Sequence, residues 1–114
     1  MGNVPNSSRS LITTANPSIV PPGAGAKYGI TYNGVSNIVL PAPIEDDINL
    51  LFTDESGHAH TITCTPAGSP PSAGLNGGTT NNKLTFNGTP GSSAELISRN
   101  GFWWAYMLNG VTVS

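Results

Sequence analysis

Short runs of alternating apolar and polar residues cover most of this chain. In Ile48-Asn-Leu-Leu-Phe-Thr53, every second residue is apolar, which places one side of a strand against a core, because successive side chains of a strand point to opposite faces. Comparable runs occupy residues 28–32, 35–40, 58–65, 83–87, 94–99, 102–107 and 111–114. Turn residues separate them at spacings of about 8–12 residues, and no helical period is sustained. The pattern predicts an all-β fold, either an antiparallel β-sandwich or a small β-barrel.

Asn100-Gly101 lies between two of these runs and predicts a two-residue hairpin turn, because both residues accept the positive φ angles of a type I′ turn. Counting outward from that turn gives the cross-strand pairs Ser98–Trp103, Leu96–Ala105 and Ala94–Met107. This face is almost wholly apolar or small, so we expect it to pack on the core. A second hairpin is predicted at Asn33-Gly34, joining residues 28–32 to 35–40.

The opposite face of the long hairpin carries Phe102, Trp104 and Tyr106 together with the charged residues Arg99 and Glu95. One interpretation is a second core face, with the alternate residues pointing outward. Burying both charges would cost several kcal/mol unless they were paired. Tyr, Trp and Arg are also the residues that most often supply interface energy. We therefore predict that Phe102, Trp104 and Tyr106 form an interface with another protein chain.

Residues 1–25 differ from the rest, because they contain four prolines and no sustained period. Proline disfavours both helices and central strands. Apolar residues are scattered through this segment: Val4, Leu11, Ile12, Ile19 and Val20. The segment is either a frayed terminus or an extended arm that becomes ordered on a neighbouring subunit. We favour the arm, and divide the chain into an extended N-terminal arm, residues 1–25, and a β-domain, residues 26–114.

Charged residues make up only 9% of the chain, and its net charge is −2. The average protein has roughly 25%, so this surface is poorly protected against association. We predict no nucleic-acid partner, because a basic patch is missing, and no membrane partner, because no apolar run approaches the roughly 20 residues of a span. The N-terminus lacks the apolar segment of a signal peptide, which suggests a soluble protein made in a cytoplasm.

Candidates for chemistry are few. His58, His60 and Cys64 share one side of a strand and include zinc or copper ligands, but such a row is more often a half-buried polar strip. The acids at residues 45–47 favour a solvated turn or helix start over a carboxylate pair. No Gly-x-Ser-x-Gly elbow marks a nucleophile, and the glycines do not follow a phosphate-loop spacing. We predict no enzyme activity, no cofactor and no metal.

Several stretches in residues 28–114 carry a resemblance to a known family. They are Ile38-Val-Leu-Pro-Ala-Pro43, His60-Thr-Ile-Thr63, Asn76-Gly-Gly78, Phe86-Asn-Gly-Thr-Pro-Gly-Ser-Ser93 and Leu96-Ile-Ser-Arg-Asn-Gly-Phe-Trp103. Their succession resembles the small β-rich head-decoration (cement) proteins of tailed bacteriophages. Similar endings also occur in phage tail-fibre and spike modules.

The resemblance implies a structural protein on the outer capsid surface of a virion, synthesised in the host cytoplasm. Its partners would be the major capsid protein and itself, as a homotrimer that clamps the expanded shell. Leu11, Ile12, Ile19 and Val20 would then dock on the capsid or a neighbouring protomer, and the three aromatic residues would line a subunit interface. One alternative is a tail-fibre or receptor-binding module that recognises host surface glycans. Another is a small metal-dependent enzyme that uses His58 and His60.

Overall fold

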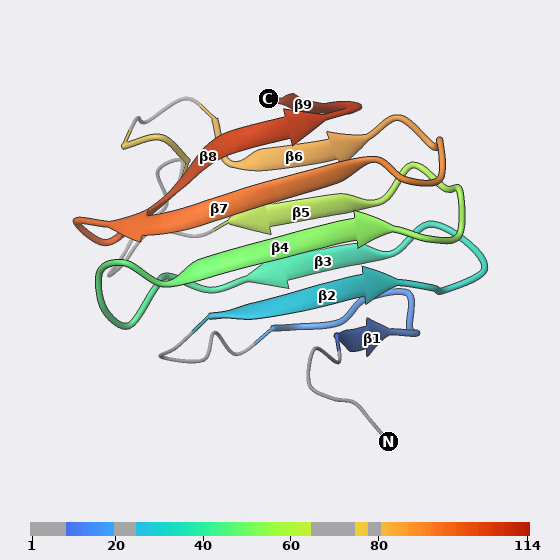
Figure 1. The fold of residues 1–114 in the computed structure, drawn as a ribbon, viewed down its shortest axis with the longest axis horizontal. Helices are drawn as coiled ribbons and strands as arrows, with labels where there is room; N and C mark the ends of the chain where they lie inside the picture. Colours follow the sequence, from blue (N-terminus) through green and yellow to red (C-terminus); the bar gives the residue numbers. More distant parts are fainter. Residues whose placement is uncertain (1–8, 20–24, 65–74, 78–80) are drawn as a thin grey trace, which may run out of the picture.

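Two β-sheets pack face to face in a computed structural model that describes residues 9–19, 25–64, 75–77 and 81–114 (Figure 1). The five-stranded sheet has the order β1 (Ser10–Ile12), β2 (Ala26–Ile30), β4 (Asn49–Asp54), β7 (Ser93–Arg99) and β8 (Phe102–Asn109). The four-stranded sheet has the order β3 (Asn37–Leu40), β5 (Thr61–Cys64), β6 (Lys83–Phe86) and β9 (Val111–Val113). The described residues contain no helix. The all-β prediction is therefore confirmed, and the two sheets do not close into a barrel.

The prediction of purely antiparallel sheets is wrong, because both sheets are mixed. Strands β1, β2 and β4 run parallel to one another, and so do β3 and β5. Tyr28 of β2 pairs with Phe52 of β4, and Asn37 of β3 pairs with Thr61 of β5. In both cases the two paired residues are separated by the same number of positions in the sequence. From β2 to β5, the chain therefore alternates between the two sheets, and each full turn places a strand parallel to the one before it in the same sheet. The later strands β6, β7, β8 and β9 all pair antiparallel with their neighbours.

The predicted hairpin at Asn33-Gly34 is also wrong, because β2 and β3 belong to different sheets. Asn33 does not adopt the positive φ that a type I′ turn requires. The amides of Thr31 and Tyr32 instead donate to the carbonyl of Ile12 at 3.0 and 3.1 Å, which directs the chain away from a hairpin. By crossing to the other sheet, the chain lets the apolar sides of β2 and β3 face each other across the core.

The core lies between the sheets and is filled by the apolar members of the alternating runs. Tyr28 and Phe52, on neighbouring strands, stack with ring centroids 4.9 Å apart. Trp103 is fully buried and its indole Nε1 donates to the carbonyl of Pro41 at 2.8 Å, so its one polar atom is satisfied. The fully buried apolar residues from both sheets include Ile30, Ile38, Leu40, Leu50, Phe52, Ile62, Leu84, Phe86, Leu96 and Trp103.

Residues 9–19 lie along the edges of both sheets. Strand β1 first adds to β2 in the five-stranded sheet. The chain then runs beside β3, where the Ile19 amide donates to the Val39 carbonyl and the Val39 amide donates to the Pro17 carbonyl, each at 2.9 Å. This part of the predicted arm is therefore packed on its own domain, and its edge position explains how a strand-like segment accommodates Pro17.

Candidate functional site

The long hairpin has the predicted turn, with φ of 53° at Asn100 and 80° at Gly101. The predicted pairs Ser98–Trp103 and Leu96–Ala105 are both present. The third predicted pair is wrong, because a β-bulge between Glu95 and Leu96 shifts the register. Ala94 pairs with Leu108, and Met107 pairs with Glu95 instead. A shift of one residue moves a side chain to the other face, so Met107 leaves the predicted core.

The bulge adds apolar surface to the outer face of the five-stranded sheet. Tyr106 is the extra residue, and both it and Met107 lie opposite Glu95, as expected where two residues of a bulged strand face one partner residue. The exposed fractions are 50% for Tyr106 and 58% for Met107. Leu108 is 37% exposed at the same edge, but it pairs with buried Ala94 and therefore lies on the opposite side of the strand. We call these three residues the β8 strip. The sequence alone indicated only Tyr106 as a member.

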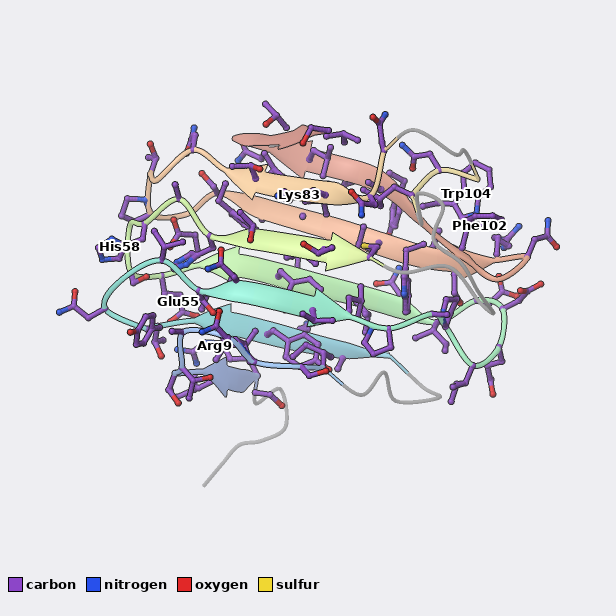
Figure 2. The ribbon with its side chains drawn as sticks, turned by 180° about the vertical axis from the view of Figure 1, so that it is seen from behind. Arg9, Glu55, His58, Lys83, Phe102 and Trp104 are labelled. Atoms are coloured by element: carbon purple, nitrogen blue, oxygen red, sulfur yellow. The ribbon has the colours of Figure 1, made fainter. Side chains whose placement is uncertain are left out.

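The other two predicted aromatic residues, Phe102 and Trp104, are half-buried at the hairpin end of the molecule, opposite the end that carries His58 (Figure 2). The indole Nε1 of Trp104 donates to the carbonyl of Arg99 at 3.1 Å, and its ring lies against Gly77. Phe102 and Trp104 are thus partly covered by their own chain, and Tyr106 is the most accessible of the three.

Tyr106 also belongs to a polar chain on the outer face. Its hydroxyl accepts a hydrogen bond from Asn49 Nδ2 at 2.6 Å and donates one to Glu95 Oε2 at 3.2 Å. The charge pattern expected for this face is present, because Arg99 is exposed and pairs with Asp47 at 2.9 Å. The acids at residues 45–47 form an exposed turn beside the hairpin tip.

The four residues predicted to dock from the arm differ in their exposure. Ile12 and Ile19 are buried in the core of their own chain, so they do not provide a docking surface as predicted. Leu11 is 54% exposed on β1, because neighbouring residues of a strand face opposite sides. Val20 lies outside the described residues.

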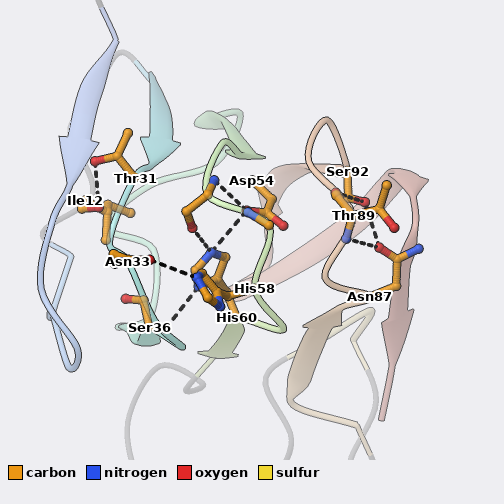
Figure 3. Close-up of polar contacts among 12 residues, drawn as sticks. Ile12, Thr31, Asn33, Ser36, Asp54, His58, His60, Asn87, Thr89 and Ser92 are labelled. Atoms are coloured by element: carbon orange, nitrogen blue, oxygen red, sulfur yellow. Dashed lines mark hydrogen bonds and ion pairs between the residues drawn. The ribbon is translucent and has the colours of Figure 1, made fainter.

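His60 is fully buried at the other end of the sandwich, where it joins the β4–β5 loop to the loop before β3 (Figure 3). Its Nδ1 accepts a hydrogen bond from the Ser36 amide at 3.0 Å. Its Nε2 lies 3.1 Å from Oδ1 of Asp54 and 2.9 Å from Oγ of Ser56. Since Nδ1 is an acceptor, the ring proton of neutral His60 is on Nε2. Burial lowers the pKa of His60, while Asp54 acts in the opposite direction.

This arrangement differs from a Ser-His-Asp triad, in which serine and aspartate contact different ring nitrogens. Here, Ser56 and Asp54 share Nε2, and a backbone amide occupies Nδ1. Neutral His60 in this arrangement has no lone pair left for a metal ion. Across the described residues, no group of three or more His, Cys, Asp or Glu side chains is placed to hold a metal. The geometry fits a structural link between loops.

Asp54 is fully buried beside His60, and the hydrogen bonds to its carboxylate all go to one of the two oxygens. Its Oδ1 accepts from the amides of Ser56 at 3.0 Å and Gly57 at 2.8 Å, in addition to His60. Its Oδ2 has no hydrogen-bond partner among the described residues. Cys64 lies at the far end of β5 from His60, and burial raises the pKa of its thiol to about 12. The sequence had grouped Cys64 with the two histidines as a metal candidate, and burial makes this thiol a poor ligand.

No family model and no curated protein matches this chain. Within the described residues, no helix is long and apolar enough to cross a membrane.

Proposed function

We propose that this protein is a structural virion component that binds the outer capsid surface as an oligomer and stabilises the expanded shell. The observation that carries this proposal is the β8 strip of Tyr106, Met107 and Leu108, three consecutive large residues exposed on an edge strand. An exposed apolar edge strand favours association with another chain unless it is blocked. The charged fraction of 9% provides little protection against such contacts.

The placement of exposed apolar residues supports a ring-shaped oligomer, for which we propose a trimer. Strands β1 and β8 form the two edges of the same sheet. Leu11 is exposed at one edge and the β8 strip at the other. Two different edges suit a head-to-tail contact, in which β8 of one copy meets β1 of the next, and such contacts generate closed rings.

The sequence resemblance to phage head-decoration proteins identifies the capsid as the proposed partner. Binding only the expanded lattice would stabilise that lattice by mass action. A trimer would also bind more tightly than a single copy, because its three contacts are linked. On this proposal, the β8 strip faces a sister protomer, and capsid contacts lie elsewhere on the surface.

Sedimentation velocity at micromolar concentration tests the oligomer. We expect a trimer for the natural chain and a monomer for Leu108→Lys, because Leu108 pairs with Ala94, away from Glu95, and a lysine there would bury an unpaired charge at the contact. Val35→Lys is the matched control, since Val35 is 44% exposed in a loop away from β8. A monomeric natural chain, or equal behaviour of the two variants, would contradict the proposed interface.

Copy number tests the location. Quantitative mass spectrometry of purified virions is expected to find this chain in numbers that match the capsid lattice. A count of only a few copies, typical of a tail component, would contradict capsid decoration. Co-sedimentation of the purified chain with empty expanded capsids provides a second measurement, and the unexpanded shell is its control.

A further inference from the structure

The outer face of the five-stranded sheet contains a shallow pocket of about 320 Å³. Its lining consists of Gly25, Ala26, Lys27, Asn49, Leu51 and Glu95. This volume is within the range of small-molecule sites, roughly 300–1,000 Å³. We infer that the pocket binds a neutral sugar unit of a glycan. This inference goes beyond the proposed capsid role, and the two surfaces adjoin at Tyr106, which belongs to the β8 strip and contacts Asn49 and Glu95 of the pocket.

The register of three strands gives the pocket its floor and two walls. Lys27, Leu51 and Glu95 form one row across β2, β4 and β7. Leu51 is the central member, and adjacent strands are about 4.8 Å apart, so the backbones of Lys27 and Glu95 are roughly 10 Å apart. The half-buried Leu51 side chain therefore provides an apolar floor with a charged group on either side. A single sugar ring fits this shape, with its C–H face on Leu51.

The polar groups beside the floor are already held in position. Asn49 Nδ2 donates to the Tyr106 hydroxyl, which donates to Glu95 Oε2. Fixed hydrogen bonds of this kind reduce the ordering cost of binding. Asn49 retains a carbonyl acceptor and a second N–H donor, and Glu95 retains further acceptor capacity. Sugar hydroxyls both donate and accept, so they match this mixture.

Gly25 lies at one end of the pocket, where its backbone packs closely against β4. A Cβ atom at this position would lie 2.5 Å from the Asn49 carbonyl oxygen, so only glycine brings the backbone this close to β4. At the other side, the half-exposed ring of Tyr106 lies beside the polar chain. Aromatic rings present an apolar body with a polar tip, which suits a sugar that has C–H and O–H groups on the same ring.

The charges of the lining indicate a neutral ligand. Lys27 contributes one positive charge and Glu95 one negative charge, so the pocket has no net charge to attract an anion. A phosphate or carboxylate would be attracted by Lys27 and repelled by Glu95. A wholly apolar ligand would displace water from the remaining polar atoms of Asn49 and Glu95 without replacing its hydrogen bonds, and an unpaired buried polar group costs about 1–3 kcal/mol. A neutral sugar avoids both penalties.

Saturation-transfer difference NMR on the full chain tests this inference, because the method detects weak binding. The probes are glucose, galactose, N-acetylglucosamine and rhamnose, each offered alone. We expect transfer to the ring protons of at least one of them. Leu51→Trp fills the floor and is expected to abolish the transfer, and Asn49→Ala is expected to reduce it several-fold. Both side chains are on the outer face, so neither change enlarges or empties the core.

Leu108→Lys is the control that separates this inference from the proposed assembly, because Leu108 pairs with Ala94 on the face opposite to Glu95. It should disrupt the oligomer and leave sugar binding unchanged, whereas Leu51→Trp should do the reverse. Absence of transfer from all four sugars would overturn the inference. Transfer that persists unchanged in both Leu51→Trp and Asn49→Ala would also overturn it. If one variant fails to fold, as judged by its urea midpoint, the other variant decides.

Discussion

Asp54 and His60 are both fully buried, and Oδ1 of Asp54 accepts a hydrogen bond from Nε2 of His60 at 3.1 Å. This contact joins the end of β4 to the residue before β5. The Ser36 amide, on the other ring nitrogen, adds the segment before β3. One imidazole therefore links the β4–β5 connection to the β2–β3 connection, and this gives a buried polar ring a structural role.

Replacing His60 by alanine is expected to lower the free energy of unfolding by about 3 kcal/mol, because it removes a partner from a buried carboxylate and from a buried amide. Urea denaturation monitored by tryptophan fluorescence measures this loss. His58→Ala is the matched control, since His58 is half-exposed and the hydrogen bond of its side chain to Asn33 is 3.4 Å long. We expect a change within about 0.5 kcal/mol for this control. Equal losses in the two variants would refute the structural role of His60.

Acidification is expected to destabilise the fold through the same residue. Burial holds the pKa of His60 below its ordinary value, so the unfolded chain binds a proton at higher pH than the folded chain does. The stability contribution is fully present above about pH 6.5, the unfolded value. It is lost as the pH falls from there through the folded pKa.

Urea midpoints measured between about pH 7.5 and pH 5 test this pH dependence, which spans the ordinary histidine pKa. In His60→Gln, the midpoint should change less over this interval. Asp54 and His58 face His60 and remain in this variant, so they serve as an internal reference. Glu55 affects stability only at lower pH, because the hydrogen bond from Arg9 holds the pKa of its carboxyl below the ordinary value. A slope in His60→Gln that equals the natural slope would exclude His60 as its origin.

The sequence predicted the strands well, because alternation depends only on local geometry. It also predicted the hairpin pairs next to Asn100-Gly101, since a two-residue turn fixes its nearest neighbours. It failed at Met107, because a bulge depends on contacts across the sheet and has no local pattern here. The register therefore held as far as Ala105 and then shifted by one residue.

Sheet membership was harder to predict than strand position. Alternation shows which side of a strand is apolar, but not whether the next strand pairs beside it or faces it across the core. The Asn33-Gly34 prediction failed for this reason. Ile12 and Ile19 were assigned to a neighbour because prolines surround them, yet an edge position accommodates proline. The pocket was missed as well, because Lys27, Leu51 and Glu95 come from three strands far apart in sequence.

Cys64 is expected to be unreactive in the folded protein. Burial raises the pKa of its thiol to about 12, and the reactive form of cysteine is the thiolate. Ellman's reagent at neutral pH should therefore label the native chain slowly and the urea-unfolded chain fully. Cys64 is the sole cysteine of the chain, so the absorbance has one source. Rapid labelling of the native chain would show that this end of β5 opens.

Gly77→Ala is expected to destabilise the protein by about 2 kcal/mol or more. Gly77 has a φ of +67°, and a Cβ atom there would lie 2.7 Å from two ring carbons of Trp104. The substitution thus adds a clash to a backbone strain of roughly 1–2 kcal/mol. The Asn76 side chain beside it accepts a hydrogen bond from the Ala105 amide, so displacing Gly77 would also disturb the edge of β8. Urea denaturation measures the loss.

Gly91→Ala is the control that separates the steric clash with Trp104 from the strain of a positive φ. Gly91 has a φ of +95°, but no atom of the described residues lies within 4 Å of the position of its Cβ, so this variant has the strain alone. The excess loss in Gly77→Ala therefore measures the Trp104 contact, and that excess should disappear when Gly77→Ala is combined with Trp104→Ala. Equal losses for the two glycine variants would mean that the Trp104 ring moves away from residues 75–77 without cost. In that case, Trp104 would be available to a partner chain, as the hairpin register first predicted.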